Sequence, residues 1–168
     1  MKTAELFRHK TVFSLEIFPP KPDADESVIY DTLDGLKGIC PDFISVTYGA
    51  GGGKNGSRTI KIASDIKYSY GVESAAHLPC IGLTKEQARD ILERMKSKGI
   101  ENVLALRGDI PQGEAPKGDF AHASDLITFI KENYDFNILA ACYPEAHPES
   151  KSRADDDVMR VRTPKNFP

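Results

Sequence analysis

Glu16 is the residue whose setting best suits acid–base chemistry. It stands in the run Phe-Ser-Leu-Glu-Ile-Phe-Pro-Pro at 13–20, and a carboxyl group among such apolar neighbours would be desolvated. Desolvation raises the pKa of a carboxyl towards the range that a general acid needs. The alternative is a solvent-facing residue on an alternating strand, because Ser14, Glu16 and Phe18 share one mixed face by period 2. The residues alone leave both interpretations open.

Two carboxylates and two histidines could also converge on a metal ion. His77 ends one β-rich segment, His147 follows another, and Asp109 comes directly after Arg107-Gly108. Barrel hydrolases that use a metal usually carry a His-x-His pair on their first strand, and the first β-rich segment here contains no histidine. We therefore predict no metal site and keep a metal-assisted barrel hydrolase as a less favoured alternative. By itself, Asp109 would be a turn or capping residue.

The glycine-rich loop Gly-Ala-Gly-Gly-Gly-Lys at 49–54 does not fit either common phosphate-binding fingerprint. The pattern Gly-x-Gly-x-x-Gly fails because its sixth position is Lys54. The Walker pattern fails because Ser57 follows Gly56 without the required lysine. We interpret this stretch as a flexible loop between a strand and a helix, and backbone approach to a ligand stays open.

Five short β-rich segments recur at intervals of roughly 30 residues, and helical patterns fill the connections between them. The β-rich segments are 11–18, 42–48, 72–78, 102–107 and 136–143, and the helical stretches are 25–37, 57–70, 84–98 and 124–133. This alternation predicts βαβ units and a parallel sheet.

The third connection is the clearest helix. Thr84 and Gln87 have the spacing of a capping box, and Gly99 ends the helix. Its apolar stripe consists of Ala88, Ile91, Leu92 and Met95. In the fourth helical stretch Ser124 is the expected N-cap. The inward-facing residues expected there are Leu126, Ile127, Phe129 and Ile130.

The polar candidates lie in or just after the carboxyl ends of the predicted strands. They are Glu16, Thr47, His77, Asp109 and Tyr143. A doubly wound sheet and an eight-stranded barrel both place their chemistry at that end, and periodicity does not separate the two.

Composition and charge restrict the class of protein. A length of 168 residues fits one domain, and a net charge of -3 with scattered Lys and Arg argues against nucleic acid as a partner. The N-terminus carries charges where a signal peptide is apolar, and no apolar run is long enough to cross a bilayer. We therefore expect a cytoplasmic protein without a membrane partner. Three widely spaced cysteines predict neither a disulfide framework nor a thiolate zinc site.

Five motifs, in order and in register, resemble the methylenetetrahydrofolate reductase family over residues 11–156. They are Phe-Ser-Leu-Glu-Ile-Phe-Pro-Pro (13–20), Phe-Ile-Ser-Val-Thr-Tyr-Gly-Ala (43–50), Ala-Ala-His-Leu-Pro-Cys (75–80), Ala-Leu-Arg-Gly-Asp (105–109) and Ala-Cys-Tyr-Pro-Glu-Ala-His-Pro-Glu (141–149). The resemblance implies an α/β fold of the TIM-barrel type, (β/α)₈, that binds FAD at its carboxyl face. It further implies a homo-oligomeric enzyme of one-carbon metabolism that uses NADH or NADPH to reduce methylenetetrahydrofolate to methyltetrahydrofolate.

The resemblance also implies roles for individual residues. Glu16 would be the general acid that helps to open the five-membered ring of the folate, and the charge of Asp109 would stabilise the resulting cation. Thr47 would approach the nicotinamide or flavin ring, and His122 occupies a place where the family often has Tyr. The remaining residues implied to contact FAD are Tyr48, His77, Arg107, Gly108, Asp109, Ala123, Tyr143, His147 and Asp156.

The sequence departs from the family pattern after residue 156. Five βα units are present, so residues 1–168 are expected to form a single incomplete barrel domain, family-like over 11–156 and divergent over 157–168. Pro164 and Pro168 would end any helix in the divergent part early, and we expect this part not to be native family sequence. An inactive half-barrel or binding fragment is therefore the alternative function.

Overall fold

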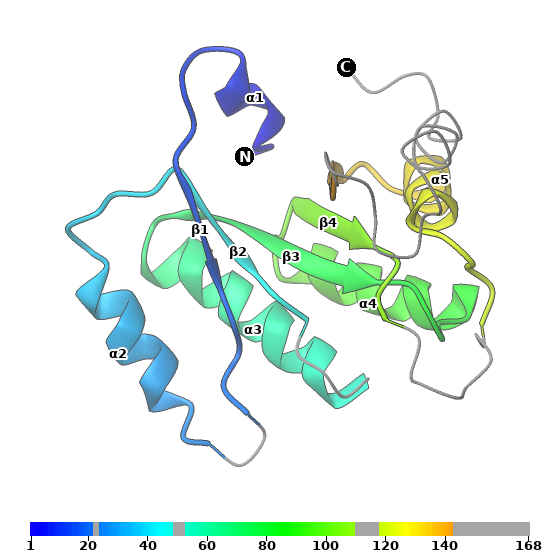
Figure 1. The fold of residues 1–168 in the computed structure, drawn as a ribbon, viewed down its shortest axis with the longest axis horizontal. Coiled ribbons are helices and arrows are strands. Elements are labelled where there is room, and N and C mark those ends of the chain that lie inside the picture. The colour runs from blue at the N-terminus through cyan, green and yellow to red at the C-terminus, as the bar shows by residue number, and fades with distance from the viewer. Residues whose placement is uncertain (22–23, 49–52, 110–117, 143–168) are drawn as a thin grey trace.

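The computed structural model describes residues 1–21, 24–48, 53–109 and 118–142. Helices and strands alternate along the chain after a short first helix (Figure 1). The helices are α1 (Ala4–Phe7), α2 (Ser27–Gly35), α3 (Gly53–Ser69), α4 (Lys85–Ser97) and α5 (Ala123–Asn133), and the strands are β1 (Ser14–Ile17), β2 (Phe43–Val46), β3 (Glu73–Pro79), β4 (Asn102–Leu106) and β5 (Asn137–Ala140).

The five strands form one parallel sheet in the order β1-β2-β3-β4-β5. The spatial order follows the chain order without reversal, as in a barrel, whereas a doubly wound sheet reverses at a switch point. Within the described ranges the sheet does not close, because β1 and β5 each pair with one neighbour. The predicted α/β class and incomplete barrel type are confirmed.

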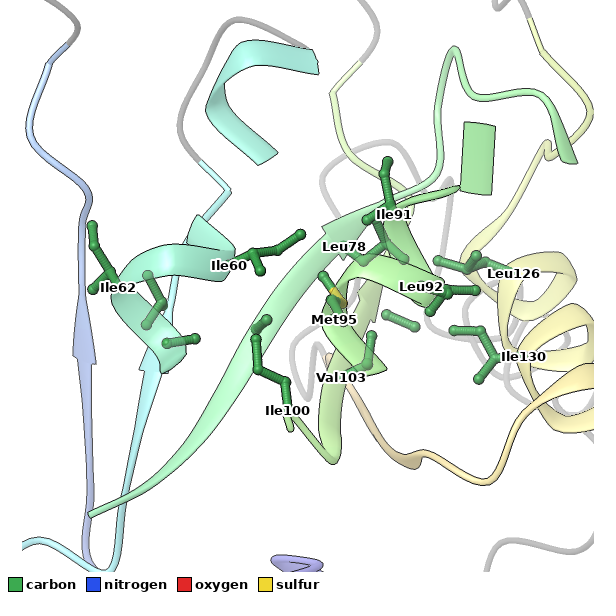
Figure 2. Packing of buried hydrophobic residues seen from close by; sticks show 14 of the residues in the cluster. Ile60, Ile62, Leu78, Ile91, Leu92, Met95, Ile100, Val103, Leu126 and Ile130 are labelled. Atoms are coloured by element: carbon green, nitrogen blue, oxygen red, sulfur yellow. The ribbon is translucent and has the colours of Figure 1, made fainter. Parts of the chain in front are cut away.

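Apolar side chains on one face of the sheet pack against the helices, and we call this the helix face. One row of paired strand residues on it consists of Ile17, Val46, Ala76, Val103 and Ile138. Figure 2 shows side chains from α3, α4 and α5 packed with strand residues in this core; among them are Ile62, Leu92, Met95, Leu126 and Ile130. The helix face therefore contains the main hydrophobic core.

Helix α4 begins as its capping pattern predicts. The backbone N–H of Gln87 donates to Thr84 Oγ1 at 3.2 Å, and the backbone N–H of Thr84 donates to Gln87 Oε1 at 2.9 Å. Gly99, with a φ of 67°, follows the end of the helix. The predicted stripe Ala88, Ile91, Leu92 and Met95 is buried.

The N-cap of helix α5 lies two residues earlier than expected, so the predicted cap at Ser124 is wrong. The helix starts at Ala123, and His122 is its N-cap residue. The reason lies in Asp125, whose carboxylate accepts the backbone N–H groups of Ala121 and His122, each at 2.9 Å. A carboxylate in the first turn thereby fixes the chain that enters the helix.

The N-terminal segment is anchored to the sheet by Asn102, which is fully buried at the start of β4. Asn102 Oδ1 accepts the backbone N–H of Thr3 at 2.8 Å and the Asn137 side-chain amide at 3.0 Å. Asn102 Nδ2 donates to the Ser74 carbonyl at 3.0 Å. One amide thus joins the segment before α1 to β3, β4 and β5.

Among the described residues, no helix combines the length and the apolar character that a membrane span requires.

Replacing Asn102 with alanine should lower the free energy of unfolding by about 2–3 kcal/mol, because the buried groups that it bonds lose their partner. Urea denaturation followed by circular dichroism measures the change. Asn133→Ala is the matched control, since Asn133 is exposed and its amide donates to the Phe129 carbonyl within the same helix. The control should change stability by less than about 0.5 kcal/mol, and equal losses in both variants would contradict the anchoring role.

Candidate active site

The predicted polar residues that the structure describes lie around the carboxyl ends of the first four strands. Glu16 lies in β1, Thr47 follows β2, His77 lies in β3, and Asp109 follows β4. Glu16 and His77 share the face opposite the helix face, which we call the open face and define by Glu16, Ser45, His77 and Leu104. Tyr143, His147 and Asp156 lie outside the described residues.

Glu16 and His77 are in contact across the open face. His77 Nε2 lies 3.3 Å from Glu16 Oε2, and Ser45 Oγ donates to the same oxygen at 3.4 Å. Strand register explains the contact, because Glu16 pairs with Ser45 and Ser45 pairs with Ala75, two residues before His77. Sequence reasoning missed Ser45, since only the pairing of β1 with β2 places it beside Glu16.

Exposure differs sharply between the two members of this contact. The Glu16 side chain is 48% exposed, whereas the His77 side chain is 8% exposed. Burial lowers the pKa of His77, and the nearby Glu16 carboxylate opposes that shift by favouring the imidazolium. Of the two interpretations of Glu16, the described structure fits a partly solvated carboxyl at the sheet edge rather than a desolvated one.

Thr47 and Tyr48 connect the end of β2 to helix α3. The Thr47 backbone N–H donates to the Ile17 carbonyl at 3.0 Å, and its carbonyl accepts Thr59 Oγ1 at 3.0 Å. Thr47 Oγ1 is buried without a hydrogen-bond partner among the described residues. Burial raises the pKa of Tyr48, whose ring lies against the first turn of α3 at Gly56.

The loop after β4 requires a glycine at position 108. Gly108 has a φ of 83°, a conformation that L side chains rarely adopt. An added Cβ would lie 2.9 Å from Pro79 Cβ and 3.1 Å from Ile81 Cγ2. Arg107 lies beside the segment that follows β3, where the Arg107 carbonyl accepts the Ile81 N–H at 2.8 Å. Asp109 is exposed directly after this turn.

Cys80, which sequence reasoning did not select, connects two of these loops. Its thiol Sγ lies 3.7 Å from the Arg107 carbonyl and 3.5 Å from the His122 carbonyl, as a weak donor to both. Burial raises its pKa to about 11. Cys80 therefore connects the loop after β4 to the start of α5, where Ala123 is the first helical residue.

The chain is similar in sequence to known proteins of one family. A family model described as methylenetetrahydrofolate reductase matches residues 2–163. A 5,10-methylenetetrahydrofolate reductase of Pectobacterium carotovorum is 44% identical over 149 residues, which cover 89% of this chain and 49% of that protein. The protein of the same name from Escherichia coli K12 is 43% identical over 149 residues, which likewise cover 89% of this chain and 49% of that protein.

A plant protein gives a further match. The probable methylenetetrahydrofolate reductase (NADH) of Oryza sativa is 40% identical over 147 residues, which cover 84% of this chain and 25% of that protein. The chain spans about half the length of the bacterial relatives and about a quarter of the plant relative.

Substituting alanine for Gly108 should lower the free energy of unfolding by about 1–3 kcal/mol, since the variant combines a disfavoured φ with one steric overlap and one tight contact. Urea denaturation measures the loss. Gly35→Ala provides the control, because an added Cβ at this last residue of α2 meets nothing within 4 Å. That control should be neutral or stabilise by up to about 1 kcal/mol. A Gly108 variant as stable as the control would show that the turn tolerates a side chain.

Proposed function

Because the chain belongs to the methylenetetrahydrofolate reductase family, we propose that it acts in the reduction of methylenetetrahydrofolate to methyltetrahydrofolate with a nicotinamide nucleotide and FAD. When bound and reduced by the nicotinamide nucleotide, the flavin would supply the hydride that the methylene carbon of the folate accepts. The reaction of the whole enzyme is a proposal for this chain, which spans about half the length of its bacterial relatives.

The observation that carries the proposal is a set of buried polar atoms without hydrogen-bond partners among the described residues. Thr47 Oγ1 lies directly after β2, and His122 Nδ1 lies directly before α5. Buried polar atoms almost always find a partner in protein or water, so an unsatisfied group often indicates a ligand site. A ligand with ring nitrogens and carbonyl oxygens, as a flavin has, fits such atoms.

The carboxyl groups of Glu16 and Asp109 would have different roles in the reaction. Glu16, on the open face, would deliver a proton to the folate as its five-membered ring opens. Asp109, exposed after the turn at Gly108, would keep its negative charge and stabilise the cation that results. Thr47 would contact the nicotinamide or flavin ring.

The remaining proposed FAD contacts divide by position. Tyr48 follows β2 and His77 lies near the end of β3. Arg107 and Gly108 belong to the loop after β4, and Ala123 is the first residue of α5. We also propose, outside the described residues, contacts from Tyr143, His147 and Asp156. The rice relative is named as an NADH enzyme, and for this chain we propose NADH or NADPH as the donor.

Three properties stay predictions from the sequence and the family: a cytoplasmic location, a homo-oligomeric assembly of full-length relatives, and the absence of nucleic acid as a partner. The folate substrate follows from the family and is proposed for this chain on the same basis.

A second candidate function is a flavin-free binding module. The observation that favours it is the open sheet, because within the described ranges the outer edges of β1 and β5 pair with no strand. Unpaired edges of parallel strands readily accept another strand, and Phe13 and Phe18 beside β1 are exposed. A chain of this kind would bind another polypeptide through its sheet edge rather than a cofactor.

Flavin binding distinguishes the two candidates. We expect the purified chain mixed with FAD to retain a yellow, protein-bound flavin after gel filtration, and anaerobic NADH or NADPH to bleach its visible absorbance. Protein that emerges colourless and binds the dye ANS, which reports exposed apolar surface, would instead favour the binding module.

Glu16→Gln should separate the two half-reactions of the proposed enzyme. Flavin reduction by the nicotinamide nucleotide should stay at the wild-type rate, whereas folate reduction should fall by about 10²- to 10⁴-fold, the usual contribution of a general acid. Stopped-flow absorbance follows each half-reaction separately. Glu132→Gln, at an exposed position on α5, is the charge-matched control and should affect neither. Equal loss of both half-reactions in the Glu16 variant would disprove the acid assignment.

A further inference from the structure

We propose that His77 is a positioning residue for Glu16: together with Ser45 it holds Glu16 Oε2 and leaves Oε1 as the oxygen that carries and releases the proton. The inference rests on the proposed function, in which Glu16 is the acid, and adds a residue that acts on the substrate only through Glu16.

The geometry converges on one of the two carboxyl oxygens. His77 Nε2 lies 3.3 Å from Oε2 and Ser45 Oγ lies 3.4 Å from it, and both neighbours come from adjacent strands of the same sheet. Ser45 and His77 are buried, while Glu16 is half exposed. Two buried groups therefore contact the same oxygen of a half-exposed side chain.

The protonation state of His77 determines whether it can donate a hydrogen bond to the Glu16 carboxylate. Burial lowers the pKa of His77, so the imidazole is neutral at neutral pH and carries one N–H. Nε2 is buried and has no complete hydrogen bond to any described residue. Leaving such an atom unsatisfied is unfavourable, and the acceptor beside it is Oε2. The tautomer with the hydrogen on Nε2 therefore fits this site.

The contact between Nε2 and Oε2 falls short of a complete hydrogen bond. Catalytic hydrogen bonds are often long or poorly aligned before the substrate binds, and they tighten in the complex. We expect a rotation of the half-exposed Glu16 side chain to align Oε2 with the buried Nε2. Binding of a ligand over the open face would favour that rotation by reducing the space available to Glu16.

Holding Oε2 has a chemical consequence for the acid. An oxygen that accepts two donors is a poor site for a further proton, because each donor stabilises negative charge on that oxygen. When Glu16 takes up a proton, Oε1 is therefore the preferred site. His77 and Ser45 thus direct the acidic O–H away from the strands, without themselves exchanging a proton with the substrate.

The tautomer of His77 gives a test that needs no substitution. In the purified, isotope-labelled full chain at pH 7.5, nitrogen NMR of the imidazole ring shows which nitrogen carries the hydrogen. We expect hydrogen on Nε2. A hydrogen on Nδ1 would leave Nε2 without anything to donate and would overturn the proposal.

Titration of the same ring tests the contact with Glu16. The carboxylate favours the imidazolium, so Glu16→Gln should lower the proton affinity of His77 about three- to tenfold, as expected for a nearby but partly solvated charge. The corresponding exchange at exposed Glu132 should leave His77 unchanged. An unchanged His77 titration in the Glu16 variant would show that the two side chains do not interact in solution.

Two substitutions of His77 separate positioning from space filling. A glutamine places its amide nitrogen close to the position of Nε2, whereas an asparagine is one carbon shorter and ends nearer the position of Nδ1. Scalar couplings to the side-chain carbons of Glu16, measured by NMR at pH 7.5, report its rotamer. They should indicate one dominant rotamer in the wild type and in His77→Gln, and values averaged over several rotamers in His77→Asn. Averaging in all three proteins would contradict the proposal.

These measurements use neither flavin nor folate, so their outcome is independent of the enzymatic tests. A chain that binds no FAD but shows the Nε2 tautomer and the ordered Glu16 would refute the proposed function and retain the pairing. If the bound flavin bleaches with NADH but Glu16 is mobile and His77 carries its hydrogen on Nδ1, the proposed function would be supported and the pairing of His77 with Glu16 refuted.

Discussion

The register of the parallel strands is the constraint on which the rest of this structure depends. Side chains alternate between the faces of a strand, so a shift of one residue in any pairing would exchange the helix face and the open face. The observed register turns Val46 and Ala76 towards the helices and leaves Glu16, Ser45 and His77 on the other side. Burial of the apolar row thereby also determines where the polar groups meet.

Local sequence patterns are sufficient to predict most of the helices and strands. The capping box and apolar stripe of α4 involve neighbours within a few turns, and the structure confirms both. The N-cap predicted for α5 lies two residues too late, because serine has a high capping preference, whereas the decisive contacts come from Asp125. Helix α1 was not predicted, since it has four residues and is anchored through Asn102, far away in the sequence.

The candidate site could be predicted only in part, because its contacts join residues that are distant along the chain. The strand-end positions of Glu16, Thr47 and His77 followed from periodicity, but no local pattern indicates that Ser45 and His77 would meet the same carboxyl oxygen. The exposure of Glu16 depends on what covers the open face, which is a property of tertiary structure. The roles of these residues came from the ordered motifs, which periodicity does not provide.

The burial of Cys80 affects how the chain would respond to oxidants. Its thiol lies between the carbonyl groups of Arg107 and His122, and its raised pKa keeps it protonated at neutral pH. Peroxides and disulfides react with the thiolate rather than the thiol, so the exposed Cys40 and Cys142 would be modified first. Oxidative damage would therefore begin at the surface and leave the junction between the β4 loop and α5 chemically intact.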